Sequence, residues 1–265
     1  MTQSHTLNNS NIRIERYPSA EETSKKAGEY INDLLTQYVD TPILLLVAGG
    51  SSLAVLEHVN PDYLSPDITV TTTDDRFSTE LDINNFAVLQ TTSFYNSLVQ
   101  ADAFCISTEP FENETLKEYA HRFEKNLKEW KQDFPKGKII ALYGMGADGH
   151  TGGMIPGLMN KEEFYREFNN PNSLVGVFDA TTYDNGSNAK SFEFPVRIST
   201  SMTFMKDWVD HAIFYITGES KRNALTKVSE DSSNGIGSED LIDLSMSPVS
   251  IVNFMKDSVI FTDIL

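Results

Sequence analysis

Residues 138–157 read KIIALYGMGADGHTGGMIPG, and this stretch decides which fold we expect for the chain. The apolar run Ile139–Tyr143 predicts a short buried strand. The strand passes into a loop with glycine at positions 144, 146, 149 and 152, wrapped around Asp148 and His150. Glycines let a backbone approach a ligand closely and present its N–H groups. Because ligands of open α/β proteins sit at the carboxyl ends of strands, we expect a binding site here.

The segment Gly144–Gly149 also fits the GxGxxG pattern of dinucleotide sites. That pattern requires a helix to begin at once, so that its N-terminus holds the pyrophosphate. The chain instead continues with HTGGMIPG, whose glycines and Pro156 oppose a regular helix. We therefore expect no nicotinamide cofactor. A tight structural turn that leaves His150 in solvent is the simplest alternative to a binding site.

The composition of the 265 residues is that of a globular protein, with 40% hydrophobic residues and a formal net charge of −17. This charge argues against general binding to nucleic acid or to anionic membranes. No apolar run is long enough to span a bilayer, and the polar N-terminus lacks the pattern of a signal peptide. The single cysteine, Cys105, excludes an internal disulfide and is interpreted as a buried small residue. We expect a cytoplasmic protein.

The rest of the chain alternates strands and helices, which predicts an α/β fold with a mostly parallel sheet flanked by helices. The pattern Ser19-Ala-Glu-Glu22 is typical of a capping box. Helices are expected over residues 20–37, 53–59, 114–132 and 221–228, and strands over residues 43–48, 68–73, 139–143, 174–180, 193–199, 211–217 and 259–262. We interpret residues 1–265 as a single doubly wound, Rossmann-like domain, with residues 231–237 (DSSNGIG) as a flexible loop and not a linker.

Groups capable of chemistry follow several of these strands. The sequence Gly49-Gly50-Ser51-Ser52, at a strand-to-helix junction, offers N–H groups and hydroxyls that suit a phosphate. Residues 74–76 supply two carboxylates and a cation, Arg197 lies in PVRIS, and Lys221 opens the last long helix. Each group alone is as well explained by a solvated surface position, so the argument depends on the set.

In this order the segments resemble those of the 6-phosphogluconolactonases and their relatives, the glucosamine-6-phosphate deaminases/isomerases. The matching pieces are AGGSS (48–52), TDDR (73–76), INNF (83–86), GMGADGHTGGMIPG (144–157), FPVRIS (194–199) and ITGESK (216–221). The long loop is the specific one, because it looks like the family's GxGxDGHTxxxxPG. The resemblance implies an enzyme of the pentose phosphate pathway that hydrolyses the cyclic ester of 6-phospho-D-glucono-1,5-lactone.

Two positions favour the lactonase branch over the isomerase branch. The isomerases carry a tyrosine where this chain has Arg76, and an acidic residue where it has Met154-Ile155-Pro156-Gly157. There are departures from the lactonases too: Asp75 replaces a usual glutamate, and Gly152-Gly153-Met154-Ile155 replaces a segment with a serine. A deaminase or isomerase, or a non-catalytic sugar-phosphate-binding protein on the same fold, remain the alternatives.

The resemblance also implies roles for individual residues. His150 is expected to be the general base that activates water, with Asp148 orienting its ring or, alternatively, holding the turn. Asp74 is expected near the sugar, where it binds a hydroxyl or positions water, and Asn85 supports this loop or forms a turn. The residues expected to bind substrate or phosphate are Gly49, Gly50, Ser51, Ser52, Arg76, Gly146, Arg197 and Lys221.

The oxyanion of the reaction would be stabilised by N–H groups of Gly49–Gly50 or of the Gly146–Gly149 loop, and the sequence does not choose between them. No metal or other cofactor is expected, because the five histidines have no metal-ligand spacing and the lone cysteine excludes a thiolate cluster. The expected partner is a small phosphosugar lactone, and the protein is expected to be a monomer or a small homo-oligomer.

Overall fold

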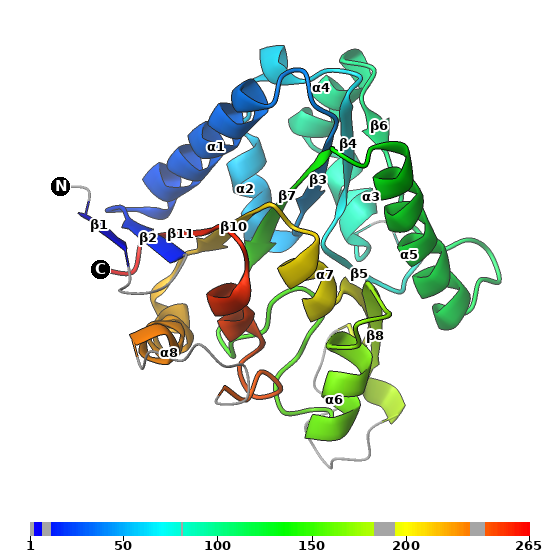
Figure 1. Ribbon diagram of the computed structural model, residues 1–265, viewed down its shortest axis with the longest axis vertical. Coiled ribbons are helices and arrows are strands. Elements are labelled where there is room, and N and C mark those ends of the chain that lie inside the picture. Colours follow the sequence, from blue (N-terminus) through cyan, green and yellow to red (C-terminus); the bar gives the residue numbers. More distant parts are fainter. Residues whose placement is uncertain (1–2, 7–11, 81, 183–193, 234–241) are drawn as a thin grey trace.

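A central sheet organises the computed structural model, which describes residues 3–6, 12–80, 82–182, 194–233 and 242–265 (Figure 1). The sheet has eight strands in the order β1-β2-β11-β10-β7-β3-β4-β6. Their bounds are β1 Gln3–Thr6, β2 Ile12–Arg16, β3 Ile43–Val47, β4 Ile68–Thr72, β6 Phe104–Cys105, β7 Lys138–Gly144, β10 His211–Ile216 and β11 Ser258–Thr262. All neighbouring strands are parallel except the edge pair β1–β2. The predicted α/β fold class is confirmed.

Helices cover both faces of this sheet, because its central strands are apolar on both sides. Alternate residues of β7 belong to different cores: Ile139 and Ala141 to one, Ile140 and Leu142 to the other. One core contains residues of α1 (Ala20–Gln37), α2 (Leu53–Leu56), α3 (Asn85–Gln90) and α4 (Ser93–Gln100). The opposite core contains residues of α5 (Leu116–Asp133), α6 (Lys161–Phe168), α7 (Met202–Asp207) and α8 (Arg222–Ser233). Figure 1 shows α1 and α5 on opposite sides of the sheet.

The longest helices begin at residues that satisfy their first N–H groups. Ser19 caps α1 by accepting the N–H of Glu22 at 3.2 Å, which confirms the predicted helix start. Thr115 and Glu118 form a reciprocal capping box at the start of α5. None of the helices in the described ranges is long and apolar enough to cross a membrane.

A second, smaller sheet corrects the sequence interpretation. The strands expected at 174–180 and 193–199 are β8 (Val175–Asp179) and β9 (Val196–Thr200). β9 is the middle strand of this sheet and pairs antiparallel with β8 on one side and with β5 (Asp74–Arg76) on the other. The sequence pattern predicts a single, mostly parallel sheet and does not separate these strands from it. Hydrophobic patterns identify a strand but not its partner, since pairing depends on contacts between distant segments. Glu193 lies outside the described residues, as do residues 234–237 of the predicted DSSNGIG loop. The first three residues of that segment, 231–233, continue the helix α8, so the prediction of a loop is wrong there.

Two further predictions are refined. Cys105 is half-buried in the edge strand β6, and burial raises the pKa of its thiol to about 11, which agrees with a residue that is not a nucleophile. The helix expected over residues 53–59 is limited to Leu53–Leu56, after a 3₁₀ turn over Gly50–Ser52.

Candidate active site

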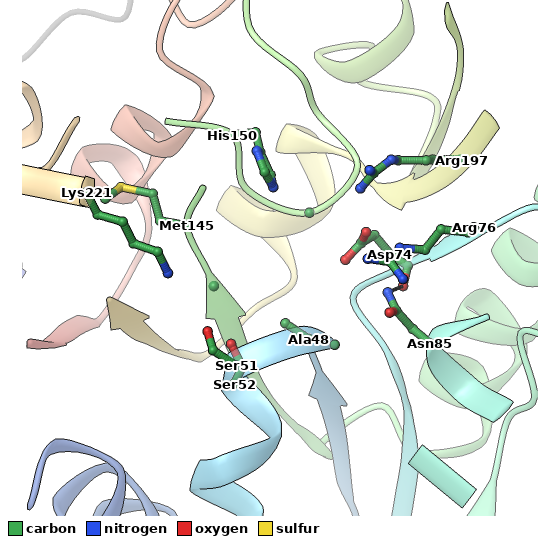
Figure 2. Close-up of a pocket in the computed structure, with 14 residues that line it drawn as sticks. Ala48, Ser51, Ser52, Asp74, Arg76, Asn85, Met145, His150, Arg197 and Lys221 are labelled. Carbon is green, nitrogen blue, oxygen red and sulfur yellow. Dashed lines mark hydrogen bonds between the residues drawn. The ribbon is translucent and has the colours of Figure 1, made fainter. Parts of the chain in front are cut away.

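A pocket of about 180 Å³ lies at the carboxyl ends of β3, β7 and β4, and the small sheet forms part of its wall (Figure 2). This is where parallel α/β sheets place their ligands. The pocket is lined by Ala48, Gly49, Gly50, Ser51, Ser52, Asp74, Arg76, Asn85, Gly144, Met145, His150, Gly152, Arg197 and Lys221. Residues from six separate sequence segments therefore meet at one edge of the sheet.

Most of the site residues expected from the sequence line this pocket, and Gly146 and Asp148 do not. Gly146 and Asp148 lie behind His150, as described below. Lining residues without an expected role are Ala48, Gly144, Met145 and Gly152. All four lie within the quoted motifs AGGSS (48–52) and GMGADGHTGGMIPG (144–157), so membership of these motifs was the available signal.

His150 forms a close pair with Asp148. Nδ1 of His150 lies 2.6 Å from Oδ1 of Asp148, and the backbone N–H of His150 donates to the same oxygen at 3.1 Å. Burial acts to raise the pKa of Asp148, but the hydrogen bonds and charge of His150 outweigh it and lower the pKa. An ionised carboxylate only accepts hydrogen bonds, so Nδ1 is the nitrogen that carries a proton toward Asp148, and Nε2 is the nitrogen left to exchange a proton with a ligand.

The glycines of the loop make this pair possible. The N–H of Gly146 donates to the carbonyl of His150 at 2.9 Å, and the N–H of Gly149 donates to the carbonyl of Gly146 at 3.1 Å. Gly149 and Gly152 have φ values of +87° and +55°, in the left-handed region that favours glycine. No helix begins between Gly144 and Lys161, as the argument against a dinucleotide site requires.

The strand β5 turns its two carboxylates to opposite sides, as the two-residue period of a strand dictates. Asp74 lines the pocket, is 6% exposed, and accepts the hydroxyl of Thr73 at 3.1 Å. Asn85 supports this strand, because its Nδ2 donates to the carbonyl of Asp74 at 3.0 Å. Asp75 is fully buried and outside the pocket lining.

Asp75 is surrounded by donors. Its Oδ1 accepts the N–H groups of Arg76 and Asn85 at 2.7 and 2.6 Å, and its Oδ2 accepts the N–H of Phe86 and the hydroxyl of Thr108 at 3.0 and 2.6 Å. Burial raises the pKa of Asp75 to about 7, against the opposing effect of these four hydrogen bonds. The carboxyl therefore links β5 to the start of α3 and stabilises the wall of the pocket.

Replacing Asp75 with asparagine is expected to destabilise the fold. An amide offers one acceptor oxygen, so the N–H of Phe86 or a neighbouring donor loses its partner, at a cost of about 1–3 kcal/mol. The folded-state pKa lies above the unfolded value of about 3.9. The folded protein therefore retains a proton that the unfolded chain has released, and this group's contribution to stability falls from about pH 4 to about pH 7.

Urea denaturation of both proteins at about pH 5 and about pH 8 measures this effect. The free-energy difference between wild type and Asp75→Asn should shrink as the pH rises, since contributions from other groups cancel in the difference. A difference that grows with pH would mean that folding favours the ionised form of Asp75.

Three cations line the pocket in a protein of net charge −17. Nη1 of Arg76 donates to the carbonyl of Ile83 at 2.9 Å, and Nε of Arg197 donates to the carbonyl of Phe194 at 3.1 Å. Neither η nitrogen of Arg197 has a hydrogen-bond partner among the residues that the structure describes. Burial lowers the pKa of Arg197. It also lowers the pKa of Lys221, and there the negative charge of Asp263 partly opposes the effect.

These groups occupy two sides of the pocket. In Figure 2, Lys221 lies on the same side as Ser51 and Ser52. The opposite side carries two arginines, Arg76 and Arg197, together with Asp74 and Asn85. The side chain of His150 points into the space between the two sides. A ligand with an anionic end and several hydroxyls fits such a division.

The segment Gly49–Ser52 differs from the expected phosphate seat. A 3₁₀ turn followed by the four-residue helix α2 contributes less dipole than a long helix. The first N–H groups of the turn nevertheless lack acceptors within it. Gly50 has φ +61°, and Asn85 packs so closely on Gly49 that a side chain there has no room.

Among the described residues, no group of three or more His, Cys, Asp and Glu side chains is arranged to hold a metal ion.

The family model for glucosamine-6-phosphate isomerases/6-phosphogluconolactonase matches residues 18–260. No curated protein matches the chain when whole sequences are compared.

Solved structures show the same fold at low sequence identity. The 6-phosphogluconolactonase from Plasmodium vivax is 14% identical, with a TM-score of 0.70 over 98% of this chain and 92% of that one. The 6-phosphogluconolactonase from Shewanella baltica is 15% identical, with a TM-score of 0.66 over 97% and 99%. A monomeric glucosamine-6-phosphate deaminase is 17% identical, with a TM-score of 0.64 over 94% and 96%. Since both kinds of enzyme share the fold, the activity must be inferred from the site.

Proposed function

Because the chain belongs to the glucosamine-6-phosphate isomerase/6-phosphogluconolactonase family, we propose that it is a 6-phosphogluconolactonase. It hydrolyses 6-phospho-D-glucono-1,5-lactone to 6-phospho-D-gluconate in the pentose phosphate pathway. The observation that carries the choice of branch is the surroundings of His150. Met154 and Ile155, which stand where the isomerases are expected to have an acidic residue, are buried in the core. Asp74 is the only carboxylate lining the pocket among the described residues.

In the proposed reaction, Nε2 of His150 takes a proton from water as the water attacks C1 of the lactone. The same nitrogen then gives the proton to the ring oxygen as the ester bond breaks, so the ring opens to the acid. Asp148 remains ionised and stabilises the charged imidazole between these steps. Such general acid–base catalysis is worth about 10²–10⁴-fold in rate.

The carbonyl oxygen becomes negative during the attack and needs hydrogen-bond donors. The N–H groups of Gly146 and Gly149 already donate within their loop, at 2.9 and 3.1 Å. Gly49 and Gly50 line the pocket, and their N–H groups have no acceptor in the described part of the chain. We therefore assign the oxyanion to the Gly49–Gly50 segment.

The phosphate is assigned to the hydroxyls of Ser51 and Ser52 and the ammonium of Lys221. Arg197 and Arg76, on the other side of the pocket, are further cations that face the rest of the ligand. Lys221 supplies a point charge, whereas an arginine supplies a planar pair of donors. Asp74, on the side opposite Lys221, binds a sugar hydroxyl or positions the water. We also propose that the enzyme acts in the cytoplasm as a single-domain monomer or small homo-oligomer.

The experiment that tests this function is hydrolysis of freshly generated 6-phosphogluconolactone, measured against the rate without enzyme because the lactone also hydrolyses unaided. We expect a large acceleration, and no release of ammonia from glucosamine 6-phosphate in a parallel assay. Ammonia release would establish the deaminase instead. Binding of 6-phosphogluconate without acceleration of either reaction would identify a non-catalytic binding protein.

A further inference from the structure

The turn that carries Lys221 is poorly held by packing. It follows β10 and comprises Gly218 and the 3₁₀ turn Glu219–Lys221. Residues 218–220 are exposed. Gly218 has φ +96°, a conformation that the chain must hold for the turn to form. Lys221 itself is half-buried, and its ammonium has no hydrogen-bond partner among the described residues. Hydrogen bonds to other segments must therefore fix its position.

Those hydrogen bonds come from the residues after β11. Because β10 and β11 are parallel neighbours with Ile216 opposite Thr262, the residues that follow both strands leave the sheet side by side. Oδ1 of Asp263 accepts the N–H of Gly218 at 2.8 Å, and the carbonyl of Gly218 accepts the N–H of Lys221 at 3.0 Å. One carboxylate oxygen thus fixes the first residue of the turn, and that residue fixes the last.

A second contact joins the same two segments. Nη1 of Arg222 donates to the carbonyl of Leu265 at 2.8 Å, and its Nη2 donates to Glu219 at the same distance. The segment after β11 is itself anchored, because Ile264 is buried in the core and its N–H donates to the hydroxyl of Thr262. A segment fixed in the core can hold an exposed turn in place.

The charge of Asp263 also acts on Lys221. Burial is the main influence on the pKa of Lys221 and lowers it, and Asp263 opposes this effect. The lysine needs its proton to attract a phosphate. Asp263 therefore contributes twice, by a hydrogen bond to the turn and by its field at the ammonium. The other charged or titratable groups of the pocket wall are Asp74, Arg76, His150 and Arg197.

We propose that Asp263 is a positioning residue that holds Lys221 at the phosphate end of the pocket. The proposal rests on the proposed function, because it takes Lys221 to bind the substrate phosphate. Asp263 does not line the pocket. Its influence reaches the ligand only through the Gly218–Lys221 turn.

The test compares Asp263→Ala, Asp263→Asn and Lys221→Ala with the wild type in lactone hydrolysis. Asp263→Ala loses the acceptor for Gly218, and we expect KM to rise about fivefold while kcat changes by less than about twofold. Lys221→Ala should raise KM more. Asparagine retains an acceptor oxygen, so Asp263→Asn should restore most of the affinity near neutral pH. Asparagine lacks the charge that opposes deprotonation of Lys221, so KM of Asp263→Asn should begin to rise at a lower pH than KM of the wild type.

Binding of 6-phosphogluconate, followed by calorimetry without turnover, separates this proposal from the proposed function. If the wild type shows no catalysis but Asp263→Ala binds 6-phosphogluconate about fivefold more weakly, the positioning role stands and the lactonase assignment fails. If the wild type is active but both Asp263 variants match it in KM, Kd and pH profile, the positioning role is wrong. Asp40→Asn, which removes an exposed charge that has no described partner, is the matched control and should change nothing.

Discussion

Replacing His150 with alanine is expected to lower kcat for 6-phosphogluconolactone by about 10²–10⁴-fold, with little change in KM. The structure shows His150 pointing into the pocket with its Nδ1 held by Asp148, so Nε2 is the group positioned to take a proton from water (Figure 2). Alanine removes this base but leaves the phosphate-binding groups in place. A stopped-flow assay, corrected for the uncatalysed rate, measures the loss.

Asp148→Asn is the informative companion variant. The amide oxygen of an asparagine can still accept a hydrogen bond from Nδ1–H but provides no charge to stabilise the imidazolium, so we expect a smaller loss than in His150→Ala. A rate that survives in His150→Ala would keep the lactonase function and move the proton transfer to another group. Asp74, the carboxylate that lines the pocket beside Arg76 and Arg197, would be the first to test.

The sequence predicts the parallel part of the fold well because its signals are local. Ile43–Val47 and Ile139–Tyr143 are continuous apolar runs. Each forms a central strand of a sheet whose two faces are both covered by helices. The small sheet was not predictable in this way. Asp74–Arg76 is too short and too polar to read as a strand, and becomes one only by pairing with residues 197–199, far along the chain.

The site was predictable to the extent that its residues end strands. Ser51, Asp74, His150 and Lys221 follow different strands, and a parallel sheet brings such positions together at one edge. The strand pattern alone does not give the direction of a side chain, and the expected roles of Asp74 and Asp148 depended on the family resemblance. Whether Asp74 or Asp75 faces the pocket depends on the register of β5 against β9, and Asp148 stands behind His150 only because the glycine loop folds back.

Gly146→Ala is expected to lower kcat by about 10²-fold or more, although Gly146 does not line the pocket. A Cβ atom at this position would lie 2.1 Å from Nδ1 and 2.2 Å from Cε1 of His150, and 2.5 Å from Oδ1 of Asp148. Atoms cannot approach so closely, so the imidazole and its carboxylate must move apart. The backbone of Gly146 does not have the positive φ that favours glycine, so alanine is excluded by these contacts and not by backbone strain.

A double-mutant cycle identifies the cause of the loss. If Gly146→Ala acts only by displacing the base, then the double variant Gly146→Ala/His150→Ala should be no slower than His150→Ala alone. Losses that multiply would show that the loop contributes to catalysis independently of the base, for example through its N–H groups. The thermal midpoint of each variant serves as the control, because a loop that has merely unfolded would lower it together with the rate. A double variant that is no slower than His150→Ala would mean that Gly146 serves catalysis by leaving room for the pair of His150 and Asp148.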